Sequence, residues 1–144
     1  MDLAELAARE AIRDLVARYA QGVDRGRFTE VAALFADDGV LELPDGRSAR
    51  GHDGIAAVFS GAGTSLRAAT GTALVRHHVT THTIALEAPH DARGAAYFVV
   101  FTDAGIDHWG CYLDHYSSTN GAWRFASRRV RIDGRAGAWS AKRS

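Results

Sequence analysis

Residues 108–132 read HWGCYLDHYSSTNGAWRFASRRVRI, and they form two runs rich in aromatic and β-branched residues around an Asn-Gly pair. An Asn-Gly step between two apolar runs is a strong signal of a β-hairpin, because both residues tolerate the positive φ angles of a tight turn. The sequence therefore predicts two antiparallel strands, 108–117 and 122–132, that meet at Asn120 and Gly121.

Two more strands are expected before this hairpin, at 75–87 and 95–103, because the same residue types recur there. The first part of the chain has a different pattern. Apolar residues repeat at three- and four-residue steps over residues 3–19, as on one face of a helix, and shorter helices are expected at 28–35 and after Asp53. Helices followed by antiparallel strands predict an α+β fold, in which a curved antiparallel sheet wraps around N-terminal helices and forms a cone-shaped cavity.

The composition narrows the class of protein. The chain has 144 residues, of which 47% are hydrophobic and 24% charged, so we expect residues 1–144 to form a single globular domain. Lys and Arg (17) balance Asp and Glu (17), which argues against nucleic acid or an anionic membrane as a partner. No apolar run approaches the ~20 residues that span a bilayer, and one cysteine, Cys111, excludes an internal disulfide. These features predict a cytoplasmic protein.

The densest cluster of chemically active side chains is RHHVTTH at 76–82. In an extended strand His78 and His82 lie ~13 Å apart, too far for both to bind one metal ion. His78 shares strand parity with Ile84, which directs it toward the core or cavity, where a neutral imidazole can accept a proton near pH 7. A core histidine bonded to main chain is the alternative, and if a β-bulge shifts the register of this strand, either His77 or His78 can face inward.

Four other candidates carry hydroxyl or carboxyl groups. Tyr19 lies on the apolar face of the first helix and Asp24 just beyond that helix, and each is equally compatible with a structural role. Asp103 ends the strand 95–103, where an aspartate is usually solvated. Asp114 shares a strand face with Tyr112, so it is either a solvent-facing residue or a buried carboxyl group held by hydroxyl groups.

Several motifs along the chain resemble those of the nuclear-transport-factor-2-like superfamily, most closely its SnoaL-like branch. In chain order they are LVARY at 15–19, VDRG at 23–26, LFADDG at 34–39, LPDG at 43–46, GHDGI at 51–55, HHVT at 77–80 and GAWRFA at 121–126. The resemblance runs from about residue 8 to residue 133 and implies an α+β cone. Members of this superfamily include ketosteroid isomerases, scytalone and bile-acid dehydratases, and polyketide cyclases.

The resemblance to ketosteroid isomerase implies roles for residues of the first helix and the third long strand. Tyr19 and Asp114 match the tyrosine and the protonated aspartic acid that form the oxyanion hole of that enzyme. Tyr112, on the same strand face as Asp114, is expected to bind substrate. Leu43 stands where the isomerase has its general base, and leucine cannot accept a proton.

The dehydratase branch implies a different base. There a histidine on the strand after the third helix removes the proton, and an aspartate after the first helix orients the catalytic groups. His78 and Asp24 are similar to this pair, and Asp103 falls where a second polar residue completes such sites. His78 would take a proton next to a carbonyl, Asp24 would hold the tautomer of its ring, and Tyr19 with Asp114 would stabilise the enolate oxygen.

These roles imply a cofactor-independent lyase or isomerase with dehydratase-type proton abstraction. Its expected partner is a small hydrophobic ligand, an apolar ring compound such as a polyketide, steroid or terpenoid, and neither a cofactor nor a metal ion is expected. A non-catalytic small-molecule-binding or dimerisation protein of the same fold is the alternative. Many relatives dimerise through the open sheet face, and apolar residues on both parities of 95–103 suit such a homodimer.

Overall fold

The computed structural model describes residues 1–142. Its elements in chain order are α1 (Leu3–Asp24), α2 (Phe28–Ala32), β1 (Phe35–Glu42), β2 (Ser48–Arg50), α3 (Gly51–Thr70), β3 (Arg76–Ala88), β4 (Asp91–Thr102), β5 (Gly105–Thr119), β6 (Ala122–Arg135) and α4 (Ala138–Lys142). The strands form one sheet in the order β2-β1-β6-β5-β4-β3. Neighbouring strands are antiparallel except β1 and β6, which pair in parallel.

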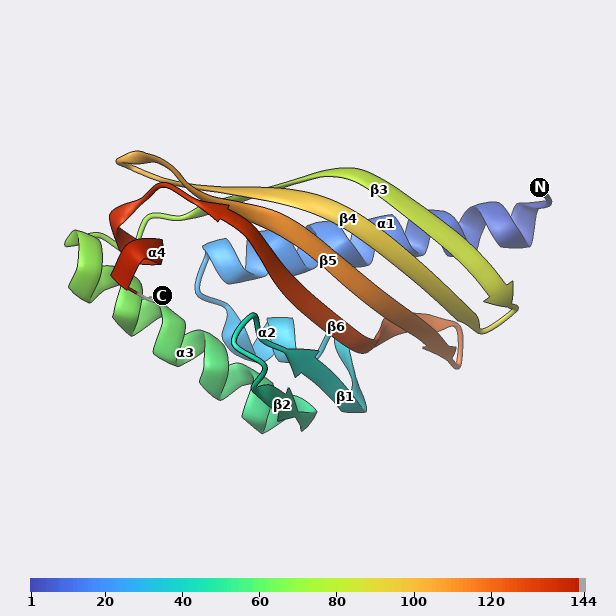
Figure 1. Cartoon of the computed structure of the whole chain (residues 1–144). Coiled ribbons are helices and arrows are strands. Elements are labelled where there is room, and N and C mark those ends of the chain that lie inside the picture. Colours follow the sequence, from blue (N-terminus) through green and yellow to red (C-terminus); the bar gives the residue numbers. More distant parts are fainter. Residues whose placement is uncertain (143–144) are drawn as a thin grey trace.

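The long strands β3 to β6 arch over α1, and α3 lies along the open side of the arch (Figure 1). Helix α1 packs against β3 and β6, whereas α3 packs against β1, β2 and the C-terminal helix α4. The predicted α+β class, with a curved and mostly antiparallel sheet around N-terminal helices, is confirmed. This arrangement leaves the concave face of the sheet turned toward the helices.

Helix α1 supplies much of the core. Its N-terminus is capped by Asp2, whose Oδ1 accepts a backbone N–H at 2.8 Å. Its buried apolar residues follow the helical period, and they are Ile12, Leu15, Val16, Tyr19 and Ala20. Because these side chains meet the sheet, the helix holds Tyr19 and the residues at its C-terminal end in fixed positions beneath the strands.

The hairpin that the Asn-Gly pair predicts is present. Asn120 and Gly121 have φ angles of 52° and 78°, and Thr119 pairs with Ala122 across the turn. Positive φ at both central residues gives the turn a twist that matches that of the strands. This turn therefore joins the end of β5 to the start of β6.

The prediction of a helix over residues 28–35 is wrong for the second half of that range. Helix α2 ends at Ala32, and Phe35 already belongs to β1, where it pairs with Phe125. Both phenylalanine side chains are fully buried, so burial in the sheet overrides the helical pattern. Within residues 1–142, no helix combines the length and apolar character needed to cross a membrane.

Candidate active site

A cavity of about 310 Å3 lies between the sheet and helices α1, α3 and α4. Much of its wall is apolar, formed by Val23, Leu41, Leu43, Val58, Phe59, Phe98, Val130, Ile132 and Trp139. Its less exposed polar side chains are Tyr19, His77, His108, Tyr112 and Ser140, whereas Asp45, Arg47 and Arg135 line it from exposed positions. A concave, mostly apolar wall with a few polar groups is typical of a small-molecule site.

His77 and Asp24 form the most constrained polar contact of this cavity. The ring Nδ1 of His77 lies 2.7 Å from Asp24 Oδ1, and the main-chain N–H of His77 donates to both carboxylate oxygens at 3.0 and 3.1 Å. Only 11% of the His77 side chain and 8% of the Asp24 side chain are exposed. Because a carboxylate accepts hydrogen bonds, it fixes the tautomer with the proton on Nδ1 and leaves Nε2 as a proton acceptor.

The inward orientation expected for His78 is wrong, because a β-bulge changes the register of β3. Thr80 pairs with Tyr97 and His82 with Ala96, so Thr81 is an extra residue, with a φ of 39°. A single extra residue exchanges the two faces of a strand. His77 therefore faces the cavity, whereas His78 is exposed and packs edge-on against Phe101, with 5.1 Å between ring centroids.

The three histidines at 76–82 point to different partners. His77 bonds Asp24, His78 lies on the outer face, and His82 Nε2 lies 3.1 Å from the hydroxyl of Tyr116. Over residues 1–142, no three His, Cys, Asp or Glu side chains come together as a metal ion would need.

Asp103 does not line the cavity. Strand β4 ends at Thr102, and Asp103 is an exposed residue of the turn that leads to β5. Asp103 therefore does not end the strand as expected, because β4 stops one residue earlier. The structure does not bring Asp103 together with His77 and Asp24.

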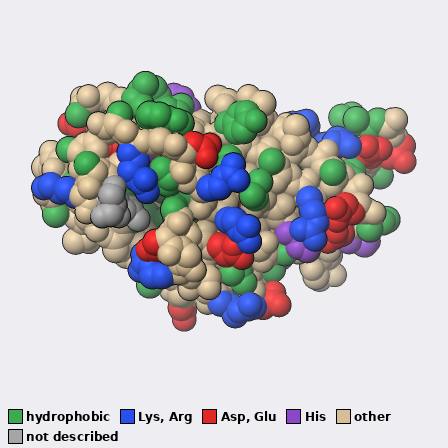
Figure 2. Space-filling model, viewed as in Figure 1, with side chains coloured by type: hydrophobic (Ala, Val, Ile, Leu, Met, Phe, Trp, Pro, Cys, Tyr) green, Lys and Arg blue, Asp and Glu red, His purple; other side chains and the backbone are tan. Residues whose placement is uncertain are grey.

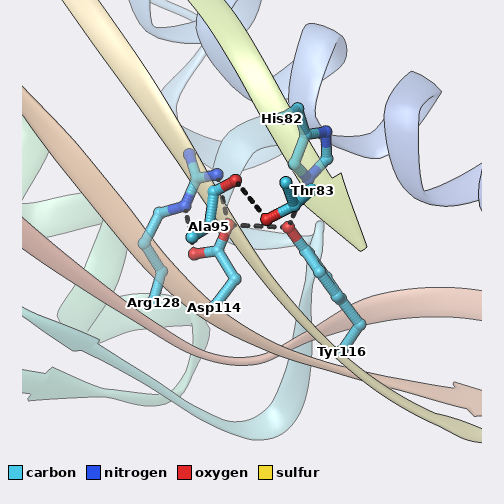
Figure 3. Close-up of polar contacts among 6 residues, drawn as sticks. All are labelled: His82, Thr83, Ala95, Asp114, Tyr116 and Arg128. Carbon is cyan, nitrogen blue, oxygen red and sulfur yellow. Dashed lines mark hydrogen bonds and ion pairs between the residues drawn. The ribbon is translucent and has the colours of Figure 1, made fainter. Parts of the chain in front are cut away.

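Asp114 lies beyond the cavity wall in a buried ion pair with Arg128 (Figure 3). Its carboxylate accepts from Arg128 Nε and Nη2 and from the Tyr116 hydroxyl, each at 2.8 Å. The guanidinium carbon of Arg128 lies 4.2 Å from the ring centroid of Tyr19 and 3.7 Å from that of Tyr112. Asp114 therefore does not line the cavity, contrary to the expectation that it would bind substrate, and its partner Arg128 packs against the two tyrosines that do.

Tyr19 and Tyr112 both line the cavity. Their rings meet edge-on with 5.9 Å between centroids, and both are buried. Burial raises the pKa of the Tyr19 hydroxyl to about 12, although Arg128 acts in the opposite direction. Burial also raises the pKa of Tyr112 well above its ordinary value. Both side chains are therefore neutral phenols at physiological pH and can donate hydrogen bonds.

His108 is a cavity residue that the sequence interpretation missed. It lies on β5, and its Nδ1 is 2.8 Å from Oδ2 of Asp107, the preceding residue. Neighbouring residues of a regular strand point to opposite faces, so an Asp-His dipeptide in a strand gives no signal of such a pair. A β-bulge makes Asp107 an extra residue between the pairs Val100–His108 and Phe101–Ile106, so the side chains of both Asp107 and His108 are buried.

The α+β cone with a ligand-sized cavity places the chain in the nuclear-transport-factor-2-like class. The chain belongs to the SnoaL-like domain family, whose model matches residues 4–129. No curated protein matches the chain.

Solved structures share this fold over most of their length. An NTF2-like protein with a cystatin-like fold from Novosphingobium aromaticivorans is 28% identical, with a TM-score of 0.76 over 96% of each chain. A putative scytalone dehydratase from the same species is 21% identical, with a TM-score of 0.77 over 96% of this chain and 95% of the other. The hexachlorocyclohexane dehydrochlorinase LinA-type3 from Novosphingobium barchaimii is 19% identical, with a TM-score of 0.80 over 94% and 93%.

Proposed function

We propose that the protein is a cofactor-independent lyase or isomerase that removes a proton next to the carbonyl group of a small, mostly apolar ring compound. The observation that carries this proposal is the contact between His77 and Asp24 at the wall of an apolar cavity. The proposed base is His77 and not its neighbour His78, because the bulge at Thr81 exchanges the strand faces that the two side chains occupy. Two similar structures, the putative scytalone dehydratase and the dehydrochlorinase, bear names that denote eliminations, which supports this class of reaction.

The proposed reaction starts with proton transfer from the carbon atom to Nε2 of His77. The imidazolium that forms keeps its Nδ1–H bonded to Asp24, whose negative charge offsets the new positive charge. The electron pair of the broken C–H bond moves to the carbonyl oxygen, and the Tyr19 and Tyr112 hydroxyls, which line the same cavity, donate hydrogen bonds to it. Loss of a β-substituent or migration of a double bond both follow from this enolate.

The cavity limits the size of the ligand. Its volume of about 310 Å3 is at the lower end of the roughly 300–1,000 Å3 that small-molecule sites occupy. Its apolar wall favours a compound with one or two rings and few polar groups. A small polyketide or terpenoid fits this description better than a steroid does.

Hydrogen–deuterium exchange of 2-tetralone tests the proton transfer without a natural substrate. The ketone is incubated with the protein in deuterium oxide, and the loss of its α-proton signals is followed by NMR. His77→Gln should lower the protein-catalysed rate by about 10²–10⁴-fold, the usual contribution of a general base. His78→Gln is the matched control and should retain the wild-type rate, because His78 is exposed on the other face of β3. Equal rates for wild-type protein and His77→Gln would contradict the proposal.

We also propose that two copies of the chain associate through the outer face of the sheet. Tyr97, Ile106, Trp109 and Leu113 of β4 and β5 are large apolar residues that are 37–58% exposed. On the face of the molecule that Figure 2 shows, positive and negative side chains are interspersed. A second copy is the occupant proposed for this face, because an apolar sheet face without a partner is unusual for a monomer.

Sedimentation velocity tests the dimer. Leu113→Glu should shift the protein from dimer to monomer, because it places a charge within the buried interface. Leu6→Glu is the control, since Leu6 is an equally apolar, exposed residue on α1, away from the sheet face. A wild-type protein that sediments as a monomer at micromolar concentration would contradict this proposal.

A further inference from the structure

A second hollow, of about 210 Å3, lies between the C-terminal end of α1 and the short helix α2. Its residues from α1 recur at steps of three and four, as on one face of a helix, and they are Arg18, Gln21, Gly22 and Arg25. Tyr19 and Val23 of the same helix line the larger cavity and lie on another face. The hollow is therefore separate from the candidate active site.

Close packing of α2 on α1 gives the hollow a fixed apolar floor. The floor consists of Val31 and Leu34, which are both buried. A Cβ at Gly22 would lie 2.7 Å from Val31 Cγ2, so glycine at this position lets α2 approach the backbone of α1. The loop between the helices is also well defined, because Gly26 has a φ of 70° and the Arg27 N–H donates to the Gly22 carbonyl at 2.9 Å. The hollow is therefore formed without a ligand.

The charges around the hollow are mostly positive. Arg18 and Arg25 line it from α1, and Arg27 lines it from the loop before α2. Within residues 1–142, neither Arg18 nor Arg25 forms an ion pair. Arg27 Nη1 lies 3.9 Å from Glu30 Oε2, and both side chains are more than half exposed, so this ion pair is weak. Three arginines against one glutamate leave an excess of two positive charges.

The C-terminal end of a helix carries a partial negative charge, which opposes the binding of an anion. In α1 this effect is reduced, because the carbonyls of Gln21, Gly22 and Val23 already accept main-chain N–H groups of the following loop at 2.9–3.1 Å. Arg25 and Arg27 lie in that loop, and their positive charges offset the remaining dipole. The electrostatic field of the hollow therefore favours an anion.

The donors of the hollow suit a phosphate group. Guanidinium groups bind phosphate oxygens through paired, charge-assisted hydrogen bonds. Arg18 and Arg25 are seven residues apart, roughly 10 Å along the helix axis, so their long side chains can meet at one anion between them. A phosphate monoester carries a charge of about −1.5 to −2 at pH 7, which balances the positive excess. We propose that the hollow binds a small organic phosphate monoester, with the arginines on the phosphate and the apolar floor against the carbon skeleton.

Isothermal titration calorimetry with phenyl phosphate tests this site. Wild-type protein should bind one molecule per chain with a Kd of about 1 mM or tighter at physiological ionic strength. Arg18→Gln and Arg25→Gln should each weaken binding by about tenfold or more, as expected for the loss of one charge-assisted hydrogen bond. Arg13→Gln is the matched control, because Arg13 is an exposed residue of α1 outside the hollow and its loss changes the net charge equally. Lack of saturable binding, or equal affinities in all four proteins, would overturn the proposal.

Two other ligands test the chemical class. Phenyl sulfate has the same shape and a single negative charge, and inorganic phosphate lacks the ring, so both should bind more weakly than phenyl phosphate. Equal affinity for phenyl sulfate would overturn the preference for a dianion, and equal affinity for inorganic phosphate would overturn the assignment of an organic monoester.

A variant of the larger cavity tests the location of the ligand. Val130→Trp, which fills that cavity, should bind phenyl phosphate as tightly as wild-type protein does. Loss of binding in this variant would place the ligand in the candidate active site and would overturn the inference. These titrations measure binding alone, so their outcome is independent of the proposed proton transfer.

Discussion

Asp24, the last residue of α1, accepts both the ring Nδ1–H and the main-chain N–H of His77, the second residue of β3. One carboxylate thus fastens the helix to the strand and sets the orientation of the imidazole. The residues are 53 positions apart in sequence, so this contact depends on the packing of α1 against the sheet. The proposed proton transfer depends on this contact.

Asp24→Asn should lower the maximal rate of 2-tetralone exchange by about tenfold or more while leaving the KM for the ketone nearly unchanged. The amide keeps the size of the side chain but cannot offset the positive charge that His77 gains on taking the proton. Exchange kinetics over a range of ketone concentrations separate the two constants. A rise in KM at constant maximal rate would show that Asp24 serves binding alone.

The buried Arg128–Asp114 pair is expected to contribute strongly to stability. Arg128→Met should lower the free energy of unfolding by about 3–5 kcal/mol, because it leaves the Asp114 carboxylate buried without its counter-charge. Arg129→Met is the matched control. Arg129 pairs with Glu42 at 2.6 Å on the exposed side of the same strand, where an ion pair contributes about 0–1 kcal/mol. Urea unfolding followed by circular dichroism measures both, and similar losses in the two variants would contradict this ranking.

The bulge at Thr81 is expected to carry backbone strain. Its φ of 39° is unfavourable for a β-branched residue, by about 1–2 kcal/mol, and glycine adopts it freely. Thr81→Gly should therefore stabilise the protein by up to about 1 kcal/mol once the entropy of glycine in the unfolded chain is included. Thr83→Gly, at an exposed position of the same strand where no positive φ is required, should destabilise it. The two changes should thus shift the unfolding midpoint in opposite directions.

His82 should make stability depend on pH. Burial lowers its pKa, Arg128 and Arg13 act in the same direction, and Asp114 opposes them. The unfolded chain therefore binds a proton at a higher pH than the folded protein. The contribution of His82 to stability is present above about pH 6.5 and is lost as the pH falls through the folded pKa. The free energy of unfolding should fall less steeply between pH 7 and 5 in His82→Gln than in wild-type protein, and equal slopes in the two proteins would contradict this prediction.

Much of the fold is predictable from local pattern. The Asn-Gly turn, the four strand-like runs and the apolar face of α1 each indicate one element, and the order of elements indicates the class. The position of Tyr19 on the inner face of α1 is also predictable, because a regular helix fixes which face its residues occupy, and Tyr19 lines the cavity. Asp24 was expected just beyond this helix as the partner of His78, and it is instead the last residue of α1 and bonds to His77.

The remaining site residues depend on β-bulges, which have no clear sequence signal. Thr81 reverses the faces of His77 and His78, although threonine is a common residue of regular strands. If the β5–β6 pairing continued without a bulge from the Asn-Gly turn, Asp114 would lie opposite Ser127. A bulge near Tyr116 shifts the register by one residue, so that Asp114 lies opposite Arg128. A third bulge brings Asp107 and His108 to one face. Register changes of one residue therefore account for the exchange of His77 and His78 and for the Asp114–Arg128 and Asp107–His108 contacts, whereas Asp103 differs because β4 ends at Thr102.

Titration of nitrogen-15-labelled protein with 2-naphthol tests most directly whether the His77 Nε2 atom meets a ligand in the cavity. This planar phenol has the shape of the enol of 2-tetralone but cannot react. The account predicts a saturable shift of the His77 Nε2 resonance, with no change at His78, and loss of the binding isotherm when the cavity is filled by Val130→Trp. A shift at His78 alone, or binding that leaves the His77 ring unperturbed, would contradict it.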